Sequence, residues 1–517
     1  MMKSPASFGL MLTLAATVAV ATLSARQKGP VMSKDNPNVH QTGDRGAGRA
    51  VFRMETFGNE GFWTDALRLP AGMAAAKFTP IDALKAGLSV NVDALDDATR
   101  KIVAAEVKTD LSPANAPTLN NPATTMALIT ANAVIGVVAK GNKVGVTCAM
   151  CHAITDGSVF SLPNGGSIGR EIDGPTPHFL NVGAALAMGA NTRAMFPLAQ
   201  LSLAANGGKT LGRAPKGLTA ASTEAEFDAY FSNPQYYPIG MFDDAPDGNG
   251  APMHITPMFR ADLAAPWGSE GSISKLENFS NLVYTALLDL TNLTTPGGRA
   301  FLHTLGGAAG DEIADDYVKV LAETGVTGYP FVKPTATGKP GEEATPIGLR
   351  VDNTKLLDLN AYMNSLPAPA GAKVDKAAAK RGETAFRQQC TSCHNVDQST
   401  FVPPMIVPMK TIFPGDDPVV LAQRQPPLNP IVNTVANIFD DKMAVVNASM
   451  RGLERGIALP LLLDLARKPV FLHDNSVPDL DTLLNSARGA RSPHPFYLDS
   501  AAARGDMVAF LKSLSAK

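Results

Sequence analysis

The chain has 517 residues, of which 45% are hydrophobic and 18% are charged, and its formal net charge is −2. This composition predicts a globular protein with a substantial core, and at roughly 100–200 residues per domain the length predicts two or three domains. The near-neutral charge, without a long basic run, argues against a nucleic-acid partner and against binding to an anionic membrane surface.

The N-terminus has the pattern of an export signal. Lys3 supplies a positive charge, the stretch from Phe8 to Val20 is mostly apolar, and Ala19-Val20-Ala21 offers a small-x-small cleavage site. The apolar run is shorter than the roughly 20 residues that cross a bilayer. We therefore expect residues 1–25 to be a cleaved signal peptide and the protein to be periplasmic, without a stable membrane span; an uncleaved anchor is the alternative.

Two helices and a hairpin are expected before the first chemical motif. One helix is predicted to begin near Gly46, and another to cover residues 98–109. Val134–Val138 and Val144–Thr147 lie on either side of Gly141-Asn142, a pattern that favours a β-hairpin, although a loop is the alternative. This hairpin would lead the chain directly to residue 148.

The rest of the chain is divided by segments that are rich in Pro, Gly or Ala. Residues 234–258 and 328–349 are rich in turn-forming residues and are predicted to be long loops. Residues 367–380 are rich in Pro and Ala and are the best candidate for a linker between domains. The linker separates a long first half, residues 26–366, from a shorter second half, residues 381–517.

Two pairs of segments indicate an internal repeat. Leu359–Leu366 and Met507–Leu514 both read as amphipathic helices with an aromatic residue at the same place, and each closes one half of the chain. Gly48–Arg53 and Gly382–Arg387 are also alike, and each is expected to belong to the opening helix of its half.

A third pair carries the most information about function. Gly268–Phe279 and Leu472–Leu483 share a register that includes Ser272 with Ser476 and Leu276 with Leu480. The same register places Ser269 opposite His473, so the two halves differ at this position.

All four cysteines belong to two Cys-x-x-Cys-His pentads, at residues 148–152 and 390–394. This is the covalent attachment pattern of c-type haem, in which the two thiols bind the porphyrin and the adjacent histidine binds the iron. The sequence therefore predicts two haem c groups, with attachment and proximal ligation by Cys148, Cys151, His152, Cys390, Cys393 and His394.

Other readings of the pentads fit less well. A disulfide framework is typical of small secreted domains, whereas this chain is long. Paired Cys-x-x-Cys motifs can bind zinc, but zinc requires no histidine directly after each pair. A thioredoxin-like redox motif needs neither the histidine nor a second copy. Export also agrees with haem, because c-type attachment takes place outside the cytoplasm.

The second half resembles the diheme cytochrome c peroxidase superfamily, which includes methylamine-pathway diheme enzymes and diheme rubber oxygenases. The resemblance is carried by residues 381–386, the pentad at 390–394 and the Leu-His-Asp-Asn-Ser-Val-Pro segment within 471–478. The first half is similar to uncharacterised diheme cytochromes, through the Thr-Phe-Gly-x-Glu-x-Phe-Trp start at 56–63 and the Asn-Val-Gly-Ala segment at 181–184.

The resemblance implies a mainly α-helical protein of two cytochrome c-like domains, the first enlarged by long loops and insertions. In this family one haem handles electrons while the other meets peroxide or oxygen. A small cytochrome c or a cupredoxin is the expected redox partner protein.

For the second haem, the resemblance favours His473 as the sixth ligand of the iron, because the oxygenase-like branch is similar in having an axial histidine in this segment. A methionine thioether is the alternative ligand, and the candidates are Met405, Met409, Met443 and Met450.

For the first haem, Ser269 stands where a histidine would be. A hydroxyl is a poor iron ligand, so this iron is expected to be open to peroxide or oxygen. Alternatively the site is closed by one of the following residues: His178, His254, Met188, Met195, Met253 or Met258.

We therefore expect electron transfer through the His394 haem and peroxidase-like reduction of hydrogen peroxide at the His152 haem. Glu270, beside Ser269, is the candidate catalytic carboxylate for moving protons. Trp267 is a candidate electron relay, or else a core residue. The alternatives are an electron-transfer cytochrome with both irons six-coordinate, and a diheme oxygenase that acts on an apolar substrate. The acidic run Asp243–Asp247 fits no dedicated calcium loop, so no metal beyond iron is expected.

Overall fold

The computed structural model describes residues 43–210, 212–261, 267–268, 273, 275–390, 394, 422–423, 444–445 and 460–515. Several residues named above lie outside the described part of the chain: the expected signal peptide, Ser269, Glu270, Cys393, Met405, Met409, Met443 and Met450.

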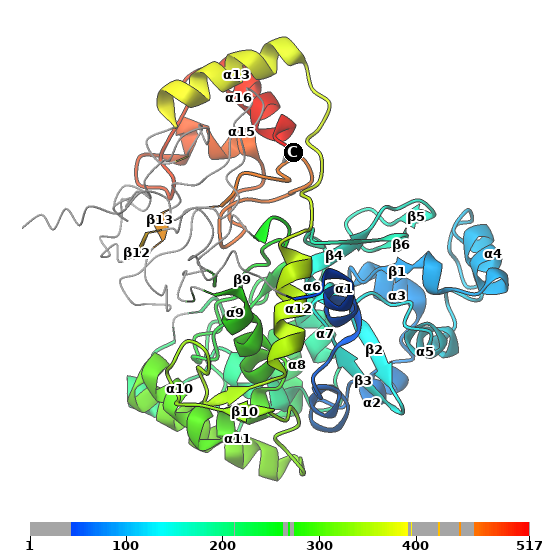
Figure 1. Ribbon diagram of the computed structural model, residues 1–517, viewed down its shortest axis with the longest axis vertical. Coiled ribbons are helices and arrows are strands. Elements are labelled where there is room, and N and C mark those ends of the chain that lie inside the picture. The colour runs from blue at the N-terminus through cyan, green and yellow to red at the C-terminus, as the bar shows by residue number, and fades with distance from the viewer. Residues whose placement is uncertain are drawn as a thin grey trace, which may run out of the picture.

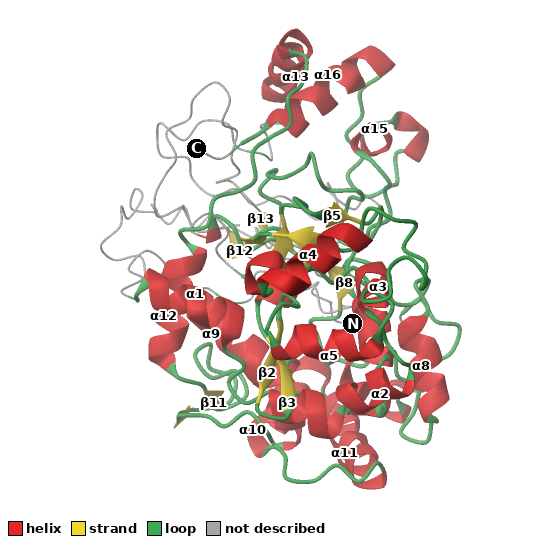
Figure 2. Cartoon of the chain, turned by 90° about the vertical axis from the view of Figure 1, so that its right-hand side faces the viewer, coloured by secondary structure: helices red, strands yellow, loops and turns green. Residues whose placement is uncertain are grey.

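The fold is mainly α, as the sequence predicts, with helices carrying most of the regular structure (Figure 2). Besides short 3-10 and π-helical turns, the described α-helices are α1 (Arg45–Met54), α2 (Leu69–Ala75), α3 (Pro80–Lys85), α4 (Asp97–Glu106), α5 (Pro122–Thr130), α6 (Ala149–His152), α7 (Val182–Ala187), α8 (Glu224–Ser232), α9 (Leu276–Leu282), α10 (Pro296–Gly306), α11 (Ala308–Glu323), α12 (Asn353–Met363), α13 (Lys376–Gln389), α15 (Leu480–Leu483) and α16 (Ala501–Ser513).

The strands are short and form small sheets. β6 lies between β1, which is parallel to it, and β5, which is antiparallel. The other sheets are the antiparallel pairs β2–β3, β4–β7, β8–β9, β10–β11 and β12–β13. The strands are β1 (Val90–Asn91), β2 (Val137–Lys140), β3 (Lys143–Val146), β4 (Ala153–Thr155), β5 (Phe160–Ser161), β6 (Ser167–Gly169), β7 (Glu171–Asp173), β8 (Met241–Phe242), β9 (Met253–His254), β10 (Ala336–Thr337), β11 (Leu349–Arg350), β12 (Ala422–Gln423) and β13 (Ala444–Val445).

The opening and closing helices of each half pack against each other. In Figure 1, α1 lies beside α12 near the centre, and α13 lies beside α16 at the top. Both crossings depend on a glycine, because a Cβ on Gly48 would lie 1.9 Å from the Asp358 carbonyl oxygen, and one on Gly382 would lie 2.1 Å from that of Asp506. Both helix pairs therefore bring their backbones into contact at one glycine.

The aromatic contacts of the two crossings are equivalent as well. Phe52 meets Tyr362 with ring centroids 5.7 Å apart, and Phe386 meets Phe510 at 5.5 Å. Each phenylalanine lies four residues after the glycine of its helix, and each aromatic partner lies four residues after the aspartate that the glycine contacts. The repeat predicted from these segments is thus present in the packing.

The third sequence pair also repeats in space. Trp267 and Ile273 exchange backbone hydrogen bonds of 2.7 and 3.1 Å, and Phe471 and Val477 exchange bonds of 2.7 and 3.3 Å. Gly268 and Leu472 both have positive φ, +88° and +68°. The helices α9 and α15 then begin at equivalent positions, so the predicted register is confirmed for the described residues, whereas Ser269 and Ser272 lie outside them.

A helix begins inside the stretch that was expected to link the two halves. α13 begins at Lys376, inside the stretch 367–380, because the side chain of Asp375 accepts a hydrogen bond from the Ala378 N–H and caps the helix. Among the described helices, none is both long and apolar enough to cross a membrane.

Candidate functional site

The hairpin before residue 148 positions the first pentad. β2 and β3 pair from Val137 with Val146 to Lys140 with Lys143, as predicted. The Thr147 N–H then donates to the Gly136 carbonyl at 3.0 Å. Gly136 has a φ of +76°, and a Cβ there would lie 2.0 Å from the Met150 nitrogen, so the pentad helix α6 rests directly on this glycine.

The first pentad opens into an apolar cavity, called here the first cavity. Cys148, Cys151 and His152 all line it. Its walls are mostly large apolar side chains, among them Trp63, Phe242, Met258, Phe279, Tyr284 and Leu287. Both thiols are free, and they reach the cavity from the same helical turn.

The reactive groups of the first cavity are held in their uncharged forms. Burial raises the pKa of the Cys148 thiol to about 11, while the Tyr284 hydroxyl, 3.2 Å from the sulfur, opposes the rise. Burial likewise raises the pKa of Cys151 to about 12. Burial lowers the pKa of His152 to about 4, against an opposing effect of the Thr256 backbone. A neutral imidazole is the form that binds a metal.

The second pentad follows α13 directly. The Cys390 N–H donates to the Phe386 carbonyl at 2.8 Å, and the His394 N–H donates to the Cys390 carbonyl at 2.9 Å. Cys390 and His394 both line a second cavity, whose described lining comes mostly from the second half of the chain. Its walls are again apolar and include Phe386, Phe471, Leu480, Leu484, Met507 and Leu511.

Besides His394, and His254 from the first half, two histidines of the second half line the second cavity. His473, the ligand favoured from the resemblance, lines it, and so does His494, which the sequence analysis did not consider. Burial lowers the pKa of His494 to about 4, with further lowering by His394 and Arg488. His494 stands between two prolines, and this sequence pattern does not indicate an iron ligand. Only the position of His494 in the fold makes it a candidate.

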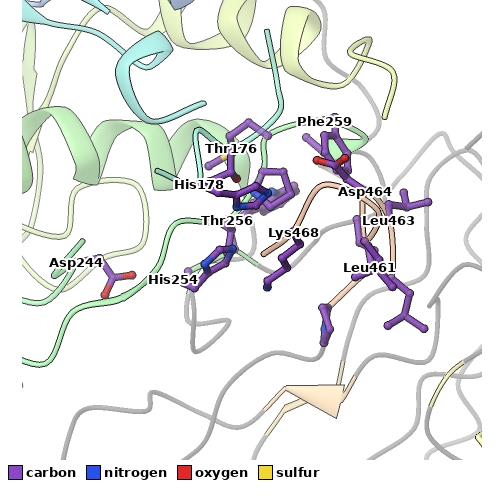
Figure 3. Close-up of a pocket in the computed structure, with 18 of the residues that line it drawn as sticks. Thr176, His178, Asp244, His254, Thr256, Phe259, Leu461, Leu463, Asp464 and Lys468 are labelled. Carbon is purple, nitrogen blue, oxygen red and sulfur yellow. The ribbon is translucent and has the colours of Figure 1, made fainter. Parts of the chain in front are cut away.

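A third cavity, called here the middle cavity, contains two stacked histidines (Figure 3). The rings of His178 and His254 have centroids 5.6 Å apart and planes 19° apart. Both ring nitrogens of His178 are buried without a hydrogen-bond partner. Burial first, and then Arg467 and Lys468, lower the pKa of His178 to about 3.

One short segment separates the cavities. Met253, His254 and Thr256 line the first and the second cavity, and His254 and Thr256 also line the middle one. The His254 N–H donates to the His473 carbonyl at 2.8 Å. β9 and the residues that follow it are therefore a shared wall between the two pentads.

Both cavities fit a thioether-bound porphyrin by the chemistry of their linings. Each has cysteine and a histidine from one pentad at its edge, and otherwise mainly apolar walls, as a large flat ring that carries iron requires. Within the described ranges, no group of three or more His, Cys, Asp or Glu residues gathers to hold a bare metal ion.

The candidate ligands of the first iron differ in which cavity they line. Met253, Met258 and His254 line the first cavity with His152, whereas His178 lines only the middle cavity. Met195 is 1% exposed and belongs to the main hydrophobic core.

Of the other candidates, Met188 packs against the same core as Met195, and Trp267 is buried and lines the middle cavity. Met507, 1% exposed, lines the second cavity and was not considered as a ligand from sequence.

No protein-family model and no curated protein matches the chain. Among solved structures, hydrazine synthase from Kuenenia stuttgartiensis, studied under 20 bar of xenon, matches with 15% identity and a TM-score of 0.24, over 53% of this chain and 76% of that chain. A TM-score this low supports no argument about the fold or function of this chain.

Proposed function

We propose that this chain is an exported, periplasmic two-haem c-type cytochrome that transfers electrons and reduces hydrogen peroxide at the first haem. One observation carries the proposal: the two Cys-x-x-Cys-His pentads each line a separate, largely apolar cavity, and the two cavities share one wall. The matching helix crossings α1–α12 and α13–α16 further support two cytochrome c-like domains.

In this proposal the chain supplies attachment, ligation and exclusion of water. Cys148 and Cys151 would hold the first haem and Cys390 and Cys393 the second, His152 and His394 would be the proximal ligands, and His473 would supply the further ligand to the second iron. Bound haem supplies one-electron chemistry at both sites, with its potential governed by ligands and burial. A small cytochrome c or cupredoxin is the proposed electron donor.

A second function, electron transfer without a small-molecule substrate, is favoured by the lining of the first cavity. His254, Met253 and Met258 line this cavity together with His152, and any one of them has a side chain suited to binding iron. If one of them closes the first iron, both haems are six-coordinate and peroxide has no open site.

Haem attachment is tested by the absorption of the reduced pyridine complex and by the mass of the exported protein. We expect two covalent haems. Changing Cys148 and Cys151 to alanine should remove one of them, and changing Cys390 and Cys393 should remove the other. Protein without added porphyrin mass, or with the cysteines paired as disulfides, would contradict the proposal.

Carbon monoxide separates the two functions. If the first iron is open, the reduced protein should bind one molecule of carbon monoxide per two haems, and it should consume hydrogen peroxide when given a reduced donor cytochrome. Reduced protein that binds no carbon monoxide and turns over no peroxide would support electron transfer alone.

A further inference from the structure

Lys468 places a positive charge at the second cavity. The residue lines this cavity together with His394, and it also lines the middle cavity, where its side chain lies between those of His254 and Asp464 in the view of Figure 3. Its ammonium lies 5.7 Å from the centroid of the Phe471 ring. Burial lowers the pKa of Lys468 to about 8, so the side chain remains largely charged at pH 7.

The charge of Lys468 is not neutralised by an ion pair within the described part of the chain. Asp464 is the carboxylate that raises the pKa of Lys468 against the effect of burial, but both of its carboxylate oxygens accept from Arg467, at 2.9 and 2.5 Å. Two cations and one carboxylate therefore leave this group with a net positive charge.

The field of Lys468 reaches the neighbouring side chains. It contributes to the lowered pKa values of His178 and of His254, in both cases after the larger effect of burial. Asp244, the other acidic residue on the middle cavity, lies on the far side of His254 from Lys468 (Figure 3). Among the described residues, the charge next to the second cavity at Lys468 is therefore positive.

We propose that the ammonium of Lys468 raises the reduction potential of the haem bound at Cys390 and His394. This inference rests on the proposed function. Reduction adds one electron to the iron and removes one positive charge from the haem, so a nearby cation stabilises the reduced form relative to the oxidised form. The effect is strong where little water screens it. Lys468 does not line the first cavity, so the first haem is affected less.

The test is a potentiometric titration of the two-haem protein, of three Lys468 variants and of one variant that retains only the second haem. In Lys468→Met and Lys468→Gln the charge is lost, whereas Lys468→Arg keeps it and serves as the matched control. The variant without Cys148 and Cys151 retains only the second haem and assigns the two potentials.

We expect either neutral variant to shift the equilibrium between the oxidised and the reduced second haem about tenfold toward the oxidised form. This corresponds to a reduction potential lower by about 59 mV for a one-electron couple. The arginine variant should stay near the unmodified protein, and the first haem should move less than the second. If a neutral variant still carries two haems and the reduction potential of its second haem is unchanged or higher, the proposed effect of Lys468 on that potential is wrong. Lack of haem in the unmodified protein would instead contradict the proposed function.

Discussion

The backbone N–H of His254 donates to the carbonyl of His473 at 2.8 Å. His254 belongs to β9, which pairs with β8 through Met241, and its side chain lines the first and the second cavity. His473 lies in the loop closed by Phe471 and Val477, which lines the second cavity. One hydrogen bond thus joins the shared wall to the segment expected to bind the second iron.

The sixth ligand of the second iron can be assigned by substitution. We expect His473→Ala to convert the second haem from low spin to high spin, because an axial imidazole is lost, and to leave the first haem unchanged. Absorption and electron paramagnetic resonance spectra of the oxidised protein measure the change.

His494→Ala is the matched comparison for this experiment, since His494 lines the same cavity from a different loop. It should leave the spin state as it is in the unmodified protein. The opposite pattern, a change in His494→Ala with none in His473→Ala, would assign the ligand to His494.

The first iron is predicted to be open, so the reduced protein should bind one carbon monoxide per two haems. His254→Phe should leave this stoichiometry unchanged, because the phenyl ring fills the space of the imidazole without binding iron. His178→Phe is the control, since His178 stacks on His254 but lines only the middle cavity. Carbon monoxide binding that is absent in the unmodified protein and appears in His254→Phe would make His254 the sixth ligand.

The helix crossing of the second half should be sensitive to one methyl group. In Gly382→Ala the new Cβ would lie 2.1 Å from the Asp506 carbonyl oxygen and 2.7 Å from the Phe510 Cβ. We expect a loss of about 1–3 kcal/mol in the free energy of unfolding, typical of overpacking, in urea titrations followed by circular dichroism.

Gly505→Ala is the control for this loss, because it lies within α16 and a Cβ there would meet no described atom within 4 Å. It should stabilise the protein by about 0.5–1 kcal/mol through helix propensity. Equal effects of the two substitutions would contradict close helix packing at Gly382.

The buried His178 should make stability depend on pH. Its folded pKa is lowered to about 3 from an ordinary value of 6.5, so between these values the unfolded chain binds a proton that the folded chain does not. Stability should therefore rise with pH across this range, with the contribution of His178 complete above pH 6.5 and lost as the pH falls toward 3.

His178→Phe should reduce that slope by at most about 1.4 kcal/mol per pH unit, measured by urea unfolding between pH 4 and pH 7. The variant should gain stability relative to the unmodified protein most strongly at the acid end. An unchanged slope would mean that His178 stays accessible to protons in the folded state.

Local sequence patterns were sufficient for several elements. The hairpin before Cys148 follows from β-branched residues around Gly141-Asn142, and α1 and α13 have sequences that match at Gly48 and Gly382 because both crossings require a residue without a side chain. The start of α13 inside the expected linker was not predicted, because the Asp375 cap was not recognised and a stretch rich in Pro and Ala does not by itself mark a helix start.

The sequence by itself determined the chemistry to be expected, since the Cys-x-x-Cys-His pentads bring thiols and imidazole together within one turn of chain. Only the tertiary structure decided which distant residues join them: His254 at the shared wall, and His494 and Lys468 at the second cavity. These residues come from separate loops without a local motif. Their convergence depends on long-range packing and backbone hydrogen bonds, such as that from His254 to His473, which no spacing along the chain encodes.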